Sequence, residues 1–197
     1  MAAFEFGINQ YRLSPVTTDF VSVEKISLPN PFTYDRATKA ISLGFVHRIN
    51  KHFEGLYFSS FLQRNEIFDY ELLKEQNSIK NVITKGNVTT YNTVLEKNIV
   101  NENRKLNYYK FSLGLRYTLY PKSVYKLYSS NYINVLKSND YGKYEMSVTT
   151  GLGLKLPFLG RTLHIEPNIE YNFNQHESYK NEVNIKYSSF GIKFLLN

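Results

Sequence analysis

Three polar residues near the carboxyl end have the types that a hydrolase uses. His176 precedes Ser178 by two positions, and Glu182 follows four residues later. A histidine beside a serine can take its proton as a general base, and a carboxylate can orient the imidazole. Polar loops that contain His and Ser are common, however, and this spacing alone is a weak signal. We therefore predict that the protein is not an enzyme and assign no catalytic residue, and a role of His176 and Ser178 in hydrolysis is kept as an alternative.

The other histidines and the closely spaced glycines do not form a cofactor or metal site. His47 and His52 flank a short connection, His164 begins a strand-like segment, and none belongs to a ligand cluster. Gly151 and Gly153 lie inside a predicted strand, not at the strand-to-helix turn of a phosphate-binding loop. Cysteine is absent, which excludes disulfides, thiolate metal sites and cysteine nucleophiles. The sequence predicts no catalytic, cofactor-binding or metal-binding residues.

Apolar and polar residues alternate over long segments of the chain, which predicts two-faced strands. The clearest segments are residues 109–119, 144–156 and 163–173. In the last strand the apolar positions change phase after Tyr187, which predicts a bulge at Ser188 and Ser189. The predicted strands are residues 4–13, 41–48, 55–70, 109–120, 124–136, 144–156, 163–173 and 183–196.

The connections between these eight strands alternate between short and long. Short ones are expected at residues 50–54, 121–122 and 157–161, and longer ones at residues 14–39, 71–105, 137–143 and 174–181. Residues 20–28 can extend a strand, and residues 71–105 are expected to form the protruding end of a hairpin, because so long a structureless loop is unusual. The sequence thus predicts an all-β protein: an eight-stranded antiparallel up-and-down transmembrane β-barrel, with one domain over residues 1–197.

Composition limits the partners and the kind of membrane protein. The formal net charge is +7, with Lys and Arg scattered rather than clustered as nucleic-acid binding requires, so we expect no nucleic-acid partner. No apolar run approaches the roughly 18 residues of a membrane helix. The 17 Tyr and 14 Phe suit interfaces between oil and water. Residues 1–5 lack the features of a secretory signal, so we expect the mature form of an exported protein, with its signal peptide removed.

The polar face of the strands mixes small residues with charges of both signs. Small residues beside paired charges suit the interior of an eight-stranded barrel, whereas glycines weaken a strand whose face is exposed to water. We therefore predict that the apolar face points outward and that the lumen holds a paired network of Arg48, Lys110, Arg116, Glu145, Lys155, Glu166 and Glu170. A narrow selective pore is the alternative role of these charges, and a soluble lipocalin-like barrel is the alternative orientation.

With this pattern the chain resembles the small outer-membrane β-barrel proteins of Gram-negative bacteria, and its Tyr, Asn and Lys usage resembles that of Bacteroidetes. Residues 187–197 are similar to the terminal strand that the barrel-assembly machinery recognises, although Asn197 stands where an aromatic residue is usual. The resemblance implies export to the outer membrane. The spacing of His176 and Ser178 is similar to that in lipid A deacylases, but the surrounding residues differ from that family's pattern.

The expected function is a structural or interaction role through the long surface segments, residues 14–39 and 71–105, as a component of an envelope complex. Expected partners are outer-membrane lipid, lipopolysaccharide, whose phosphates Lys137, Lys143 and Lys180 can meet, and another envelope protein. Two alternatives stay open: a soluble lipocalin-like barrel that binds a small ligand, and a lipid A-modifying outer-membrane hydrolase.

Overall fold

The computed structural model describes residues 1–16, 20–27, 36–85, 88–140, 142–177 and 183–197, and these residues are almost entirely β-strand. The strands are β1 (Ala2–Pro15), β2 (Phe20–Ser27), β3 (Ala37–Arg48), β4 (Phe53–Lys85), β5 (Val88–Thr118), β6 (Lys126–Ser138), β7 (Tyr144–Phe158), β8 (Arg161–Asn172), β9 (His176–Glu177) and β10 (Val183–Leu196).

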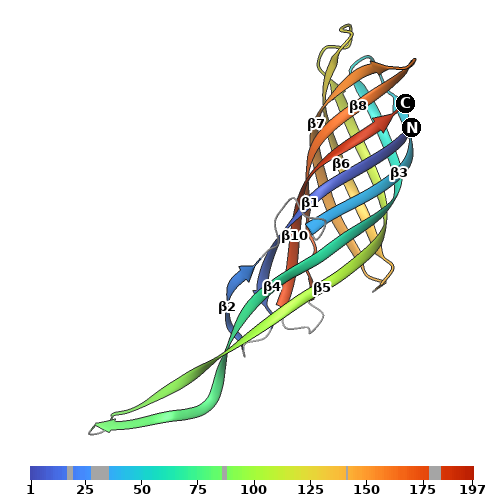
Figure 1. Ribbon diagram of the computed structural model, residues 1–197. Coiled ribbons are helices and arrows are strands. Elements are labelled where there is room, and N and C mark those ends of the chain that lie inside the picture. The colour runs from blue at the N-terminus through green and yellow to red at the C-terminus, as the bar shows by residue number, and fades with distance from the viewer. Residues whose placement is uncertain (17–19, 28–35, 86–87, 141, 178–182) are drawn as a thin grey trace.

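Eight of these strands close into an antiparallel ring. The order is β1, β3, β4, β5, β6, β7, β8 and β10, and β10 pairs again with β1 from Ala2↔Leu196 to Pro15↔Val183. The two remaining strands lie outside the ring, β2 against β4 and the short β9 against β10. The predicted all-β fold with eight up-and-down strands is therefore confirmed, and Figure 1 shows the strands tilted around the barrel axis.

The connections alternate between the two ends of the barrel as expected. Residues 49–52, 119–125 and 159–160 join strands at one end, called the short-turn rim, where the two chain ends also lie (Figure 1). The tightest turn has Leu159 and Gly160 with φ of 45° and 73°. A two-residue hairpin with both central residues at positive φ matches the twist of the flanking strands.

At the opposite end, β4 and β5 continue far beyond the rest of the ring. Their pairing extends from Phe53↔Tyr117 to Lys85↔Val88, with register shifts between Gln76 and Asn81. By contrast, β5 pairs with β6 only from Tyr108 onward. The part beyond β2, residues 75–85 and 88–95, is called the arm and protrudes from the barrel in Figure 1. The hairpin predicted for residues 71–105 is confirmed. The segment 14–39, expected as a long connection in which residues 20–28 can extend a strand, contains β2 (Phe20–Ser27).

The bulge predicted at Ser188 and Ser189 is wrong. β10 pairs with β1 in an unbroken register through both serines, and its buried and exposed residues alternate from Val183 to Leu195. The apolar residues change phase because they face the interior at the start of the strand and face outward at its end. Val183 and Ile185 point into the barrel, while Phe190 is exposed on the outside.

Candidate functional site

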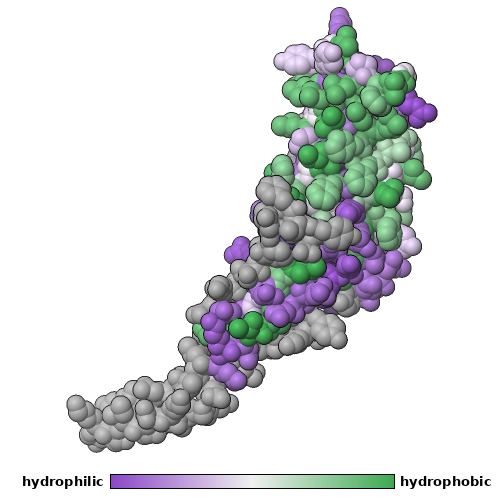
Figure 2. All heavy atoms as spheres, in the orientation of Figure 1, coloured by the Kyte–Doolittle hydropathy of each residue, from purple (hydrophilic) through white to green (hydrophobic). Residues whose placement is uncertain are grey.

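An apolar surface surrounds the short-turn half of the barrel. On β5 the outward residues Phe111, Leu113 and Leu115 are 61%, 62% and 47% exposed. Figure 2 shows hydrophobic residues gathered over this half and hydrophilic residues toward the arm. This surface is called the belt, and its other members include Ile41, Leu43, Phe45, Phe61, Ile133, Met146, Leu152, Leu154, Ile169, Phe190, Ile192 and Phe194. So extended an apolar surface marks contact with an apolar medium or partner.

Exposed aromatic residues border the belt at both ends. Toward the arm lie Tyr109, Tyr144 and Phe173, and toward the short-turn rim lie Tyr117 and Phe158. Tyrosine suits such borders because its ring is apolar while its hydroxyl needs a polar partner. The belt is therefore bordered at both ends by exposed aromatic residues.

Polarity is inverted in the arm-side half of the barrel. On the same strand β5, the outward residues there are Asn101, Asn103 and Lys105, and all three are exposed. The interior instead holds an apolar cluster of Tyr11, Phe68, Tyr70, Leu72, Val100, Val183, Ile185 and Tyr187. Burial raises the pKa of the Tyr11 phenol, and its hydroxyl donates to the Asn65 carbonyl at 2.5 Å. The arm-side half thus combines outward polar residues with an interior that holds this apolar cluster and the buried Arg104–Glu66 ion pair.

The lumen enclosed by the belt is filled with paired charges. Lys110 lies 2.7 Å from a carboxylate oxygen of Glu170 and 4.0 Å from Glu5, and Lys193 lies 3.7 Å from Glu5. The Ser147 hydroxyl donates to the other oxygen of Glu170 at 2.5 Å. All of these side chains are buried. Buried charges are tolerated only when paired in this way, so the network has the role of packing.

A second layer of the lumen is centred on Arg64. Its guanidinium stacks over the rings of Tyr187 and Tyr108, 3.3 and 4.5 Å from the ring centroids. It also lies 3.4 Å from Glu145, which accepts from the Tyr108 hydroxyl at 2.9 Å and from Asn172 at 2.5 Å. The planar cation thus separates the polar lumen from the apolar cluster of the arm-side half.

Large aromatic side chains in the lumen lie directly across from glycines on the neighbouring strand. Gly153 pairs with Tyr128 in the β6–β7 ladder, and Gly114 pairs with Tyr132 in the β5–β6 ladder. A methyl group on either glycine would overlap the facing ring. Glycine is therefore required at both positions because the tyrosine ring packs directly against the backbone there. This explains why glycines, which otherwise weaken strands, occur in the middle of these two.

Gly153→Ala should consequently destabilise the barrel by about 1–3 kcal/mol, the usual cost of overpacking a filled interior. Gly7→Ala is the matched control, because a methyl group there would lie 3.5 Å from the Phe190 carbonyl oxygen, an ordinary contact. Urea unfolding followed by circular dichroism measures both variants. Equal midpoints for the two would contradict the steric role of Gly153.

The short-turn rim contains a cavity of about 270 Å³. Glu54 lies on one side of it and accepts from Arg116 at 3.2 Å and from Lys155 at 2.7 and 2.8 Å. Behind these residues the ring of Tyr128 packs against the Arg116 guanidinium at 4.4 Å and edge-on against His164 at 5.7 Å. The cavity is thus a charged opening, and Tyr128 packs behind two of the residues that line it.

The structure corrects one of the predicted lumen charges. Lys110, Arg116, Glu145, Glu166 and Glu170 are buried in the lumen as expected, and Lys155 is half-buried at the rim. Arg48, however, is exposed, and its Nε donates to the Asn50 carbonyl. The reason is that Arg48 is the last residue of β3, where the chain turns away from the barrel wall.

The hydrolase candidate is only partly within the described residues. His176 lies in β9 opposite Ile185, whereas Ser178 and Glu182 lie outside the residues that the structure describes, as does Lys180. His47 is exposed, and His52 contacts the Thr118 carbonyl at 2.9 Å. Within the described ranges, no three His, Cys, Asp or Glu side chains are grouped to hold a metal ion.

Several members of the lumen network were not predicted from the sequence: Glu5, Glu54, Arg64, Glu66, Arg104 and Lys193. Two of them carried a signal, because Glu5 stands between Phe4 and Phe6, and Lys193 stands between Ile192 and Phe194. A charge between two outward apolar residues must point inward. Arg64 stands between the polar residues Gln63 and Asn65, so the sequence pattern does not show that it points inward. Its position is known only from the strand pairing in the structure.

Comparison with known proteins assigns no family. No protein-family model matches the chain, and no curated protein matches it. Over the part of the chain that the structure describes, no helix has the length and apolar character to cross a membrane. The closed barrel, the belt and the charged lumen are therefore the observations on which a function can be based.

Proposed function

We propose that the protein is an outer-membrane β-barrel whose belt contacts lipid and whose arm-side half stands in water, with a structural or interaction role and no enzymatic activity. The inversion of polarity along single strands carries this proposal. On β5, exposed Asn101 and Asn103 give way to exposed Phe111 and Leu113. The interior changes from an apolar cluster beside the buried Arg104–Glu66 ion pair to a lumen filled with paired charges. A strand that passes from water into a lipid bilayer needs this change.

The orientation follows from the connections. In barrels of this class the short turns face the periplasm and the longer connections face outward. The arm and β2 would therefore stand outside the cell, and the two chain ends would lie on the periplasmic side (Figure 1). Tyr, Asn and Lys usage favours a bacterium of the Bacteroidetes type. Outer-membrane lipid would be the partner of the belt, and Lys137, which lies over the Tyr144 ring, and Lys143 would meet lipopolysaccharide phosphates.

Fractionation of the natively expressed protein tests the location. We expect recovery with the outer membrane and a gel mobility that changes on heating, because a closed barrel stays folded in detergent until it is boiled. Recovery without detergent in the soluble fraction would contradict the proposal.

The arm is the part that we propose to contact another envelope protein. It projects away from the barrel as a two-stranded ladder, and β5 has no ladder partner besides β4 over residues 88–107 among the described strands. Exposed strand edges offer backbone donors and acceptors to another chain. Rigid barrels commonly place binding on such projections.

Replacing residues 76–94 with Asn-Gly should remove the interaction without unfolding the barrel. Glu75 and Leu95 are paired, so a two-residue turn can join them, and the apolar cluster around Tyr70 and Val100 remains intact. Crosslinking in the native host, followed by mass analysis of the products, should show one protein partner with the full chain and none with the shortened chain. Identical crosslinks in both would assign the contact to another surface.

The alternatives have less support. A lipocalin-like barrel needs an apolar wall facing inward, whereas Lys110, Glu170 and Arg116 occupy that position within the belt. A narrow pore needs an open path, whereas these charges are paired across the lumen. A lipid A-modifying hydrolase needs His176 and Ser178 together, and this alternative stays untested because Ser178 lies outside the described residues.

A further inference from the structure

The cavity at the short-turn rim has more positive than negative charge. Four basic side chains line it, namely those of Arg116, Lys126, Lys155 and Arg161, against one acidic side chain, that of Glu54. Arg116 and Lys155 already share that carboxylate. Lys126 and Arg161 form no ion pair within the described part of the chain, although both line the opening. Elsewhere in the lumen, by contrast, Lys110, Lys193 and Arg64 each face a carboxylate.

Polar atoms at the back of the cavity also lack partners. Arg116 is fully buried, and within the described residues its Nε and Nη2 have no hydrogen-bond acceptor; the closest carboxylate to Nη2 belongs to Glu166, at 3.8 Å. His164, 2% exposed, lines the same cavity, and its Nδ1 has no partner among those residues either. Buried polar atoms without partners cost free energy, so the Arg116 guanidinium is better accommodated with an acceptor in the cavity and His164 with a polar partner there.

We propose that this cavity binds a soluble compound that carries a phosphate group. The phosphate oxygens would accept hydrogen bonds from Arg116 and charge-assisted contacts from Lys126 and Arg161, and His164 would contribute a further polar contact. A multiply charged anion fits best, because a single carboxylate would leave part of the positive charge unbalanced. The inference stands apart from the proposed function, since it concerns the inside of the barrel wall and not the belt.

A soluble ligand is favoured over a lipid headgroup by the position of the cavity. Arg116 and His164 point into the ring of strands, whereas the lipid-contacting surface proposed above is formed by residues of opposite orientation, such as Leu115 and Tyr117. A headgroup anchored in the bilayer would have to fold over the rim to reach Arg116.

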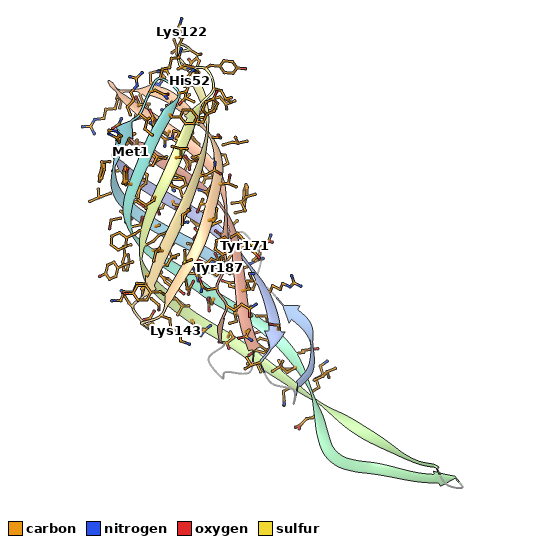
Figure 3. All side chains as sticks on the ribbon, turned by 180° about the vertical axis from the view of Figure 1, so that it is seen from behind. Met1, His52, Lys122, Lys143, Tyr171 and Tyr187 are labelled. Carbon is orange, nitrogen blue, oxygen red and sulfur yellow. The ribbon has the colours of Figure 1, made fainter. Side chains whose placement is uncertain are left out.

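Binding of inorganic pyrophosphate to the folded protein in a nonionic detergent tests the proposal. Calorimetry should show saturable binding that falls about tenfold or more in Lys126→Gln/Arg161→Gln, because two unpaired cations are removed. Neither residue is buried, so this variant should fold, which circular dichroism and heat-dependent gel mobility check. Lys137→Gln/Lys143→Gln is the matched control at the opposite end of the barrel, where Figure 3 places Lys143, and should bind as the unaltered protein does.

Nitrogen NMR of labelled histidine locates the site. Pyrophosphate should shift the imidazole resonance of His164 and leave that of His47 unchanged. Absence of saturable binding, or equal loss in both double variants, would overturn the proposal. Tighter binding of dihexanoyl phosphatidylglycerol than of pyrophosphate, lost in Lys126→Gln/Arg161→Gln, would overturn the soluble source and assign the site to a lipid headgroup.

Discussion

Leu113→Arg should weaken folding of the barrel into lipid vesicles by about 2–4 kcal/mol, the cost of placing an arginine near the middle of a bilayer. Leu113 is 62% exposed and lies in the middle of the belt on β5, between Phe111 and Leu115. Leu154→Arg on β7 should have an effect of the same size, and the two effects should add because the residues lie on strands that are not neighbours. The measurement is the fraction of heat-modifiable protein in phosphocholine vesicles across a urea series.

Asn101→Arg is the control for this prediction. It lies on the same strand, is exposed and points outward, but it stands in the arm-side half. A surface substitution there should change stability by no more than about 0.5 kcal/mol. Equal effects of Leu113→Arg and Asn101→Arg would mean that the belt and the arm-side surface contact the same solvent, and the assignment of the belt to lipid would fail.

Lys110→Met should destabilise the folded barrel by about 3–5 kcal/mol, because it leaves the buried carboxylate of Glu170 without its paired cation. Lys110 is 2.7 Å from Glu170 and 4.0 Å from Glu5, and all three side chains are buried. The methionine keeps most of the volume, so the loss reports charge pairing and not a cavity. Urea unfolding in detergent micelles, followed by circular dichroism, provides the free energy of unfolding.

A double-mutant cycle separates the pair from its surroundings. Lys110→Met/Glu170→Gln should recover much of the stability lost in Lys110→Met, because the neutral amide no longer needs a cation and can still accept from Ser147. Strict additivity of the two single effects would show that Lys110 and Glu170 do not interact, contrary to the paired lumen described above.

The barrel architecture was predictable from the sequence because alternation is strong where one face is apolar and the other is small or charged. Residues 109–119 show this on β5, and the structure confirms every inward and outward assignment along it. β4 was harder to interpret because both of its faces carry large apolar or aromatic residues at this point. Leu56 and Phe58 point inward and Tyr57 points outward, so apolar and polar residues do not alternate. The change of phase in β10 was misread as a bulge because polarity inversion and an inserted residue produce the same pattern.

The pairings within the lumen were not predictable from one sequence. Arg116 and Glu54 are 62 residues apart, and Lys155 and Glu54 are 101 residues apart. Which charges meet depends on the register of the ladders, and register is set by the whole ring. The same holds for the rim cavity, to which β4, β5, β6, β7 and β8 all contribute residues.

The most direct test of the lipid-facing belt uses the absence of cysteine from the chain. Single substitutions Leu113→Cys and Asn101→Cys would each carry a fluorescent probe in vesicles that contain lipids brominated near the bilayer centre. We predict strong quenching of the probe at position 113 and little at position 101, because only the former faces hydrocarbon. Equal quenching at both positions, or none at position 113, would contradict the central claim that the belt lies in a membrane.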